Sequence, residues 1–325
     1  MSWRPSASLA TLQLRARLLA RLRAFFAARG VLEVETPAMS LAGSMDPALT
    51  SVTARVQALG GARMYFQTSP EFAMKRLLAA GSGDIYQICR VYRDGEVGRW
   101  HQPEFTMLEW YRVGWDDFRL MDEVGALLTE VLEREDVRPE TVRMSYHEAF
   151  ERFVGVDPGA DPDSLAAALE GQGLAVPAAA DQRSLLDFAL SAAVAPALPR
   201  SVLTFIYDFP ADQAALARTK PTTPAVAARF EAFFDGIELA NGFAELTGAA
   251  EQRRRFEAER AQRLAAGHDV PPLDEALLAA LEHGLPDCAG VAVGFDRLVA
   301  AAAGIDGINA TVSFAHAAAG AAPLS

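Results

Sequence analysis

The chain has 325 residues, of which 51% are hydrophobic and 22% charged, a composition typical of a folded globular protein. This length allows one large domain or two smaller ones, with a core that needs no disulfide bonds. The formal net charge of −12 disfavours a polyanionic partner such as RNA, except at a local basic patch. The two cysteines and the scattered histidines argue against a disulfide framework and a zinc site.

No segment reaches the ~18 uninterrupted apolar residues of a membrane span, and the basic N-terminus lacks the apolar block of a signal peptide. We therefore expect a cytoplasmic protein without a membrane partner.

The first elements form a compact series. Residues 9 to 29 carry Leu and Phe at three- and four-residue spacings, which predicts an amphipathic helix. Gly30 follows where a left-handed C-cap belongs, and "VLEVETP" then predicts a short strand that ends at Pro37. Next, "MYFQTSPEFAMKRLLAAG" predicts a strand, a turn at Ser69-Pro70 and a helix.

The middle of the chain begins with a hairpin. Residues 85 to 93 and 104 to 111 alternate in hydrophobicity, which predicts two antiparallel strands joined by a long loop. Residues 116 to 200 are rich in Ala and Leu with Pro and Gly breaks, and this pattern predicts several helices. A strand is expected at residues 201 to 210.

A second hairpin is predicted in "ARFEAFFDGIELANGFAEL", where Asp235-Gly236 suits a two-residue type I′ turn. This turn pairs Phe233 with Glu238, so Glu231 and Glu238 fall on one face. Two converging carboxylates repel each other unless a cation bridges them, and Mg²⁺ is the natural candidate. An exposed acidic face is an equally good interpretation of the spacing.

The last part of the chain adds one strand and one helix. Glu245 has the opposite parity to Glu238, and a bulge at Gly242 would re-aim it. In "GVAVGFDR" an apolar strand turns at Gly294 into a helix, and the informative residue is Arg297, because no P-loop pattern is present. A largely antiparallel sheet flanked by helices makes the predicted fold α+β.

Strand parity separates the side chains of "RDGEVGRWHQPEFTMLEWY". Phe105, Met107, Glu109 and Tyr111 share one face. A glutamate flanked by Met107 and Tyr111 is costly if unpaired, which favours a pocket for a cation or amine over a solvated charge on a core strand. Arg93 would then face an anion such as phosphate, which suits its planar guanidinium.

Taken in order, these segments resemble the catalytic domain of class II aminoacyl-tRNA synthetases, with the lysyl branch closest. The unit from Gly30 to Pro37 with its helix is similar to motif 1, "CRVYRDGEVGRWHQPEFTMLEWY" to motif 2 and "GVAVGFDRLV" to motif 3. "TSPEFAMKRLL" and "GIELANGFAEL" are similar to two further lysyl-type segments. The resemblance implies one catalytic domain over residues 1–325, a helical insert at about 116–200, and a homodimer formed through motif 1.

The motif 1 helix begins near the start of the chain, so we expect no anticodon-binding domain and no tRNA acceptor. This arrangement, with "GVLEVETP", "PEFTMLEWYR", "GIELANGF" and Ala292, resembles the truncated lysyl-tRNA synthetase paralogues that ligate (R)-β-lysine to elongation factor P. The resemblance implies adenylation of (R)-β-lysine, or lysine less well, using ATP and Mg²⁺, followed by transfer to a lysine side chain of that factor. The alternatives are a synthetase-like ligase acting on another carrier and a non-catalytic paralogue.

The resemblance also implies roles for matching residues. Arg93 and Arg297 would be the catalytic cations, with Arg93 on the α-phosphate and adenine between Phe105 and Arg297. The expected ATP contacts are Arg93, Asp94, Gly95, Glu96, His101, Gln102, Phe105, Glu238, Leu239, Gly294 and Arg297. The expected substrate contacts are Ser69, Pro70, Glu71, Glu109, Tyr111, Asn241, Glu245 and Ala292, and Glu231 and Glu238 would bind Mg²⁺. The methyl group of Ala292 would distinguish amino-group positions by ~1–3 kcal/mol.

Two positions depart from the family pattern. Gly95 stands where the family has a glutamate that reads the adenine amino group, and Glu96 comes one residue later. Gln102 replaces the usual asparagine. The Ala-rich C-terminal segment also departs, and no role is assigned to it.

Overall fold

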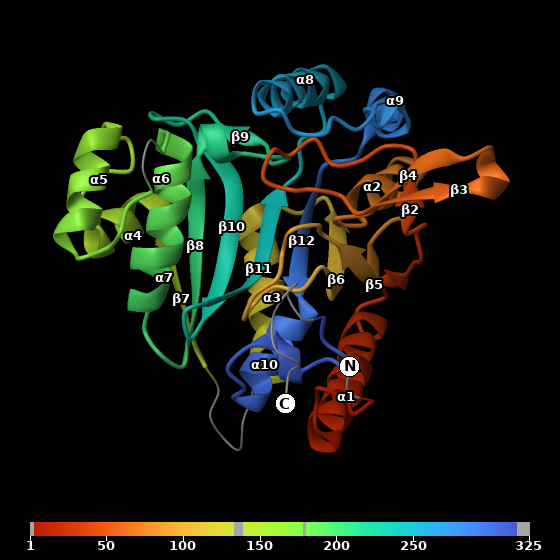
Figure 1. Ribbon diagram of the computed structural model, residues 1–325, viewed down its shortest axis with the longest axis horizontal. Coiled ribbons are helices and arrows are strands. Elements are labelled where there is room, and N and C mark those ends of the chain that lie inside the picture. The colour runs from red at the N-terminus through yellow and green to blue at the C-terminus, as the bar shows by residue number, and fades with distance from the viewer. Residues whose placement is uncertain (1–2, 133–138, 178–179, 317–325) are drawn as a thin grey trace. The chain divides into compact units, whose positions relative to one another are not determined.

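The computed structural model describes residues 3–132, 139–177 and 180–316 (Figure 1). The fold consists of two compact units. The first is formed by Met1–Trp115 and Leu246–Ser325, and the second by Asp116–Glu245.

The first unit contains two groups of paired strands. In the larger group β1 (Leu32–Glu33) runs parallel to β5 (Ile85–Tyr92), and β6 (Glu104–Val113) pairs antiparallel with both β5 and β12 (Cys288–Gly294). The smaller sheet has the order β2 (Met39–Ser40), β4 (Ala62–Phe66) and β3 (Thr53–Val56). The hairpin predicted from residues 85 to 111 is thus confirmed as β5–β6, with β6 central in its group.

The helices of the first unit are α1 (Leu9–Ala27), α2 (Glu71–Ala79), α8 (Ala249–Ala265), α9 (Glu275–Gly284) and α10 (Phe295–Ala303), with short 3₁₀ turns η1 (Gln57–Leu59) and η4 (Ile308–Ala310). Helix α1 begins after Ser8, whose hydroxyl accepts a hydrogen bond from the Thr11 backbone N–H at 3.1 Å. Its buried side includes Phe26, whose ring stacks on Tyr86 with centroids 4.4 Å apart. The motif 1 helix is therefore packed directly on the β5 strand.

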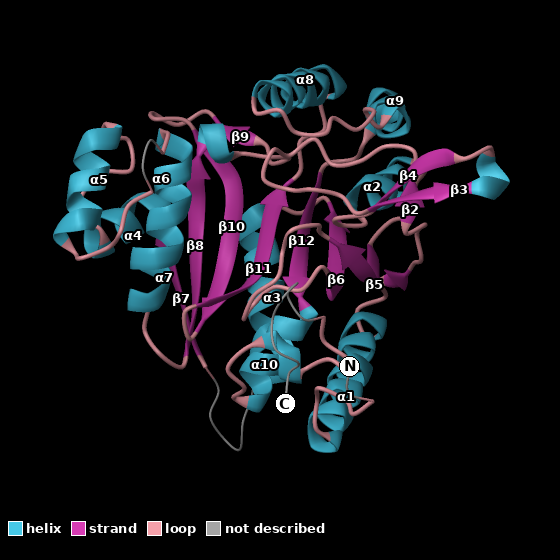
Figure 2. Cartoon of the chain, in the orientation of Figure 1, coloured by secondary structure: helices cyan, strands magenta, loops and turns pink. Residues whose placement is uncertain are grey.

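The second unit is a sheet in which β7 (Glu140–Ser145) runs parallel to β8 (Val202–Pro210), and β10 (Val226–Phe234) pairs antiparallel with β8, β9 (Thr219–Lys220) and β11 (Ile237–Ala244). Its helices are α3 (Asp117–Leu132), α4 (Tyr146–Phe153), α5 (Pro162–Gly171), α6 (Gln182–Ala189), the π-helix η2 (Leu190–Val194), α7 (Ala195–Ala197) and the 3₁₀ turn η3 (Ala211–Gln213). Helix α3 packs on β8, β10 and β11, while α4 to α7 gather beside β8 (Figure 2).

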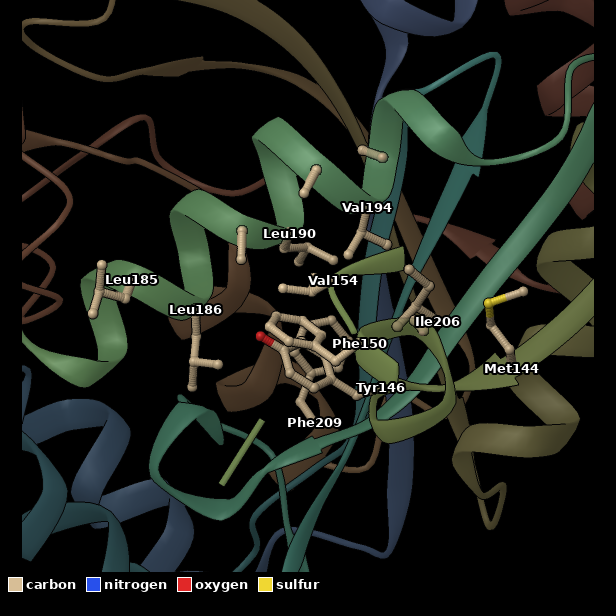
Figure 3. Packing of buried hydrophobic residues seen from close by; sticks show 14 of the residues in the cluster. Met144, Tyr146, Phe150, Val154, Leu185, Leu186, Leu190, Val194, Ile206 and Phe209 are labelled. Atoms are coloured by element: carbon tan, nitrogen blue, oxygen red, sulfur yellow. The ribbon is translucent and has the colours of Figure 1, made fainter. Parts of the chain in front are cut away.

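A cluster of buried aliphatic and aromatic side chains forms the core of the second unit (Figure 3). Tyr146 stacks on Phe150 with ring centroids 4.4 Å apart and meets Phe209 at 4.7 Å. Such aromatic rings bury large areas and dominate core energetics. Phe233 of β10 belongs to the same cluster, so this core anchors the hairpin that carries the candidate metal ligands.

The predicted α+β class is confirmed, because most of the strand pairs are antiparallel and helices flank the strands. The expected helical insert at about 116–200 is only partly right, because this range also contains β7. In "ETVRMS", Val142 and Met144 alternate with polar residues, which is the two-residue period of a strand. The surrounding Ala- and Leu-rich segments obscured this short pattern.

Candidate functional site

The β5–β6 register sets the face on which the first group of predicted site residues lies. Phe105 pairs with Val91, Glu109 with Gln87 and Tyr111 with Ile85. Directly opposed residues point to the same face of a sheet. The shared face expected for Phe105, Glu109 and Tyr111 is therefore confirmed.

Arg93 directly follows β5 and lies at the Phe105 end of this face. Its guanidinium carbon is 5.1 Å from the centroid of the Phe105 ring, within the range of a cation–π contact. Its Nε donates to the backbone oxygen of Thr68 at 3.4 Å, and its Nη1 lies 3.7 Å from a carboxylate oxygen of Glu96. The arrangement presents a cation beside a half-buried aromatic ring, and these two chemical groups suit a phosphate and a base.

The loop after Arg93 explains the glycine that departs from the family pattern. Gly95 has a φ of +82°, and its backbone N–H donates to Asp94 Oδ1 at 2.9 Å. A left-handed backbone is strained for a residue with a Cβ atom, so glutamate is disfavoured here. Glu96 follows this turn and forms an i,i+3 ion pair with Arg93.

Arg297 and His101 meet at the other end of the loop. Arg297 Nη2 lies 2.9 Å from His101 Nε2, and its Nε donates to the backbone oxygen of Trp100 at 3.3 Å. Gly294 precedes Arg297 as the N-cap of α10. Motifs 2 and 3 are thus joined through the predicted nucleotide-binding arginine.

Gln102 has partners that the sequence did not indicate. Its side chain donates to Asn309 Oδ1 at 2.8 Å and to the His316 backbone oxygen at 3.1 Å, and it accepts from the His316 backbone N–H at 2.7 Å. The residue is 2% exposed. Its amide therefore links Asn309 and His316 to the motif 2 loop, and the predicted ATP contact remains a prediction.

A compact acidic cluster lies at the other end of the β6 face. Glu109 accepts hydrogen bonds from Tyr111 at 2.7 Å and from Ser69 at 2.8 Å. Ser69 also accepts from the backbone N–H of Glu71, the first residue of α2, at 3.0 Å, and Pro70 is the N-cap of this helix. The predicted amine-binding residues of this unit are brought together.

Burial is the main reason that the pKa of Glu109 is raised to about 7, and the nearby charge of Glu71 raises it further. The hydrogen bonds from Tyr111 and Ser69 oppose this rise. A bound ammonium group would favour the ionised carboxylate. Ala292 pairs with Glu109 in the β6–β12 ladder, so its methyl group lies on the same face as this carboxylate.

The second group of predicted residues lies on the β10–β11 hairpin. Asp235 and Gly236 have φ values of +53° and +79°, so the predicted type I′ turn is confirmed. Phe233 pairs with Glu238, as expected. Ala232 then pairs with Ala240, which leaves Leu239 as the extra residue of a bulge.

The bulge corrects one expectation. It lies at Leu239 and not at Gly242, which pairs with Phe230 in regular register. Asn241 now opposes Glu231 and shares its face, and the alternation carries Glu245 to the same face. A bulge of this kind needs no glycine, which is why the sequence suggested the wrong position.

The carboxylate of Glu231 is buried next to other charged groups. Arg229 Nη2 lies 2.5 Å from its Oε1, which also accepts from Asn241 at 3.3 Å. The pKa of Glu231 is raised to about 7, first by burial and then by the charge of Glu238, while Arg229 opposes the rise. Two neighbouring carboxylates that repel each other fit a hard divalent cation, so the donor set suits Mg²⁺.

Leu239 and Glu245 are both buried, at 1% and 0% exposure. Leu239 is the inserted residue of the bulge, and its predicted ATP contact remains a prediction. The backbone of Glu245 forms an isolated antiparallel bridge with Ala217. The pairing of β10 with β11 therefore determines the position of Leu239, and the bridge to Ala217 that of Glu245.

Sequence reasoning missed three charged residues that support these groups. Lys75 Nζ lies 2.6 Å from Glu71 Oε1, and Arg229 pairs with Glu231. The available signals were the spacing of four residues between Glu71 and Lys75 on a helix and of two residues between Arg229 and Glu231 on a strand. Arg15 was missed because its partners are distant in sequence.

Arg15 ties motif 1 to motifs 2 and 3. It forms an ion pair with Asp296, and its Nη2 donates to Thr106 Oγ1 at 2.6 Å. Asp296 Oδ2 accepts from the Thr106 backbone N–H at 2.7 Å. Because Thr106 follows Phe105, this buried network fixes the strand that carries the aromatic ring.

Three further features of the described residues bear on the site. A cavity of about 600 Å³ between α2, α9 and the segment after β1 is lined largely by alanines and by none of the predicted residues. Within the described ranges no group of three or more His, Cys, Asp or Glu side chains is placed to hold a metal. No described helix is long and apolar enough to cross a bilayer.

Comparison with known proteins agrees with this geometry. Residues 1–318 match the family model "tRNA synthetases class II (D, K and N)". The chain is 49% identical over 319 residues to the elongation factor P–(R)-beta-lysine ligases of Pectobacterium carotovorum and Vibrio cholerae, covering 96% of this chain and 97% of each relative. It is 48% identical over 320 residues to the ligase of the same name from Edwardsiella ictaluri, with the same shares covered. The chain belongs to the class II tRNA synthetase family of the D, K and N type.

Proposed function

We propose that this chain is an ATP-dependent ligase that adenylates (R)-β-lysine, and lysine less well, and transfers it to a lysine side chain of elongation factor P. The observation that carries the proposal is the β6 face, which presents an aromatic ring under an arginine at one end and a buried glutamate at the other. The names of the relatives, at 48–49% identity over nearly the whole chain, support the same substrates.

ATP would be held by the residues of motifs 2 and 3. In this proposal Arg93 binds the α-phosphate, and adenine stacks on Phe105 with Arg297 on its other side. Asp94, Gly95, Glu96, His101, Gln102, Gly294, Glu238 and Leu239 complete the nucleotide contacts. Glu96, beside Arg93, takes the place of the glutamate that the family has one residue earlier.

The amino acid would be held by carboxylates. Glu71 and Glu109 receive its ammonium groups, with Ser69, Pro70 and Tyr111 fixing their positions. We assign Asn241 and Glu245 to the same substrate, and Ala292 to the choice between α- and β-amino placement.

Mg²⁺ would be held by Glu231 and Glu238, and when bound it would neutralise charge on the phosphates of ATP. Neither carboxylate acts as a nucleophile in this proposal.

The reaction needs no covalent bond to the protein. A carboxylate oxygen of the amino acid attacks the α-phosphorus, the bond to the bridging oxygen breaks, and pyrophosphate leaves. The neutral amine of the acceptor lysine then attacks the acyl carbon, AMP leaves, and the amine loses a proton to solvent. Arg93 and Arg297 stabilise the charge that develops on phosphate, so catalysis is mainly positioning and electrostatics.

The proposal includes a cytoplasmic homodimer that forms through the motif 1 region. Leu32 and Leu41 are 55% and 60% exposed in this region, and Leu9 on α1 is 71% exposed. Exposed apolar side chains of this size are typical of contact surfaces. Sedimentation equilibrium tests the dimer, and a monomer at micromolar concentration would contradict it.

The decisive experiment is the intact mass of elongation factor P after incubation with this protein, ATP and (R)-β-lysine. We expect a gain of one lysyl residue and release of pyrophosphate. Arg93→Ala should abolish both. Arg90→Ala should not, because Arg90 is an exposed residue three positions earlier that pairs with Glu104.

Other outcomes identify the alternatives. Pyrophosphate exchange without modification of the factor would indicate a different carrier. ATP binding without exchange for any amino acid would indicate a non-catalytic paralogue. Charging of tRNA as the sole reaction would overturn the proposal.

A further inference from the structure

Lys75 is a buried cation that the proposed reaction does not use. It is 1% exposed and lies on α2, one helical turn after Glu71. Lysine is almost never fully buried unless it is paired, because an isolated ammonium group loses its hydration. Its Nζ is 2.6 Å from Glu71 Oε1, which is a short charge-assisted contact.

The Lys75–Glu71 pair is buried beside Glu109 and does not lie on the protein surface. The side chains of Lys75 and Glu71 are 2% and 13% exposed. Ser69 links the start of α2 to β6, because its hydroxyl accepts from the Glu71 N–H and donates to Glu109. Lys75, Glu71 and Glu109 therefore form one group.

The charges around Glu109 can be assigned element by element. From α2, Glu71 raises its pKa and Lys75 lowers it. On β6 the hydroxyl of Tyr111 donates to it. The strands on either side place Gln87 and Ala292 opposite it, and the neighbouring thiol of Cys89 is neutral because its pKa is raised to about 12, mainly by burial.

We infer that Lys75 is a positioning residue for amino acid recognition, which holds one oxygen of Glu71 and supplies the positive charge that lets Glu71 and Glu109 sit together as carboxylates. The inference rests on the proposed function, because it concerns the amine end of that substrate. When both glutamates are ionised, the two carboxylates and one ammonium give this group a net charge of −1. A diamino acid with two ammonium groups and one carboxylate carries +1, so the group matches it in charge.

Replacing Lys75 changes this balance in a predictable direction. In Lys75→Met the two carboxylates face each other without a counter-charge, and Glu109 takes up a proton at higher pH. A protonated Glu109 no longer attracts the substrate ammonium. Affinity for the amino acid is therefore reduced, and the reduction is largest at low pH.

The experiment measures pyrophosphate exchange with ATP and (R)-β-lysine at pH values below and above 7, for wild type, Lys75→Met and Lys75→Arg. For Lys75→Met we expect the acidic limb of kcat/KM for the amino acid to move up by ~1 pH unit, and the KM for (R)-β-lysine to rise ~10-fold at neutral pH. The KM for ATP should stay within about twofold. Lys75→Arg keeps the charge and should keep the wild-type limb.

A second variant separates charge from folding. In Lys75→Met/Glu71→Gln both members of the ion pair are removed, so neither charge acts on Glu109, and the acidic limb should return toward its wild-type position although the KM stays high. An unmoved limb in Lys75→Met, or equal rises in both KM values, would overturn the inference. If wild type itself shows no exchange with (R)-β-lysine, the proposed function fails instead, so the two failures are distinct.

Discussion

Asp296→Asn tests the buried network that joins α1, β6 and α10. The substitution keeps an oxygen that can accept from the Thr106 N–H but removes the charge that balances Arg15. The side chains of Asp296 and Arg15 are 3% and 13% exposed, so the pair is screened little by solvent. Removing one partner of a buried pair typically costs 3–5 kcal/mol, and the retained acceptor places the expected loss of unfolding free energy near ~3 kcal/mol.

Urea denaturation measures this loss, and Asp269→Asn is the matched control. Asp269 also pairs with an arginine, Arg63, but the two side chains are 48% and 42% exposed, so its loss should be at most ~1 kcal/mol. Adding Arg15→Met to Asp296→Asn should cost less than the sum of the single changes by ~1 kcal/mol or more, because the stranded charge is removed. Equal losses for Asp296→Asn and Asp269→Asn would refute the reasoning.

Three further substitutions test the environment of Glu109, the contacts of Gln102 and the proposed Mg²⁺ ligand Glu238. Burial raises the pKa of Glu109 from 4.5 to about 7, so the free energy of unfolding should fall as the pH rises through this window. Glu109→Gln should reduce that fall, as measured by urea titrations at pH 5 and 8. Gln102→Glu keeps the acceptor for the His316 N–H but loses two donated bonds, so hydrogen exchange of the His316 amide should be faster; unchanged exchange would contradict this role. Glu238→Gln should raise the Mg²⁺ concentration needed for half-maximal exchange ~10-fold and lower the pKa of Glu231, whereas an unchanged Mg²⁺ dependence would exclude Glu238 as a ligand.

The elements that depend on local pattern were predictable. The β5–β6 hairpin followed from alternation, and the Asp235-Gly236 turn from the two left-handed positions that a type I′ turn requires. Side-chain parity then placed Phe105, Glu109 and Tyr111 on one face of the second strand without any knowledge of the rest of the chain. Local periodicity determines which side of a strand a residue occupies, and this much of the site follows from it.

The features that the sequence did not reveal depend on distant partners. Gln102 binds residues more than two hundred positions away, so neither its departure from the family pattern nor that of the C-terminal segment could be interpreted alone. The position of the bulge at Leu239 depends on how β11 pairs with β10, and Lys75 looks like an ordinary surface lysine until α2 is packed. These are properties of tertiary contact and not of local sequence.

The regular register of β6 has a consequence for substrate size. A strand advances by about 3.4 Å per residue, so the Phe105 and Glu109 positions, four residues apart on one face, are separated by about 14 Å. Both edges of β6 are paired, with β5 and with β12, and a shift by one residue would turn Glu109 to the opposite face. In the proposed enzyme the strand therefore fixes the distance between the Phe105 position, where the base would stack, and the Glu109 position, where the distal amine would bind. An amino acid with a shorter side chain would not reach Glu109 while its adenylate stays on Phe105.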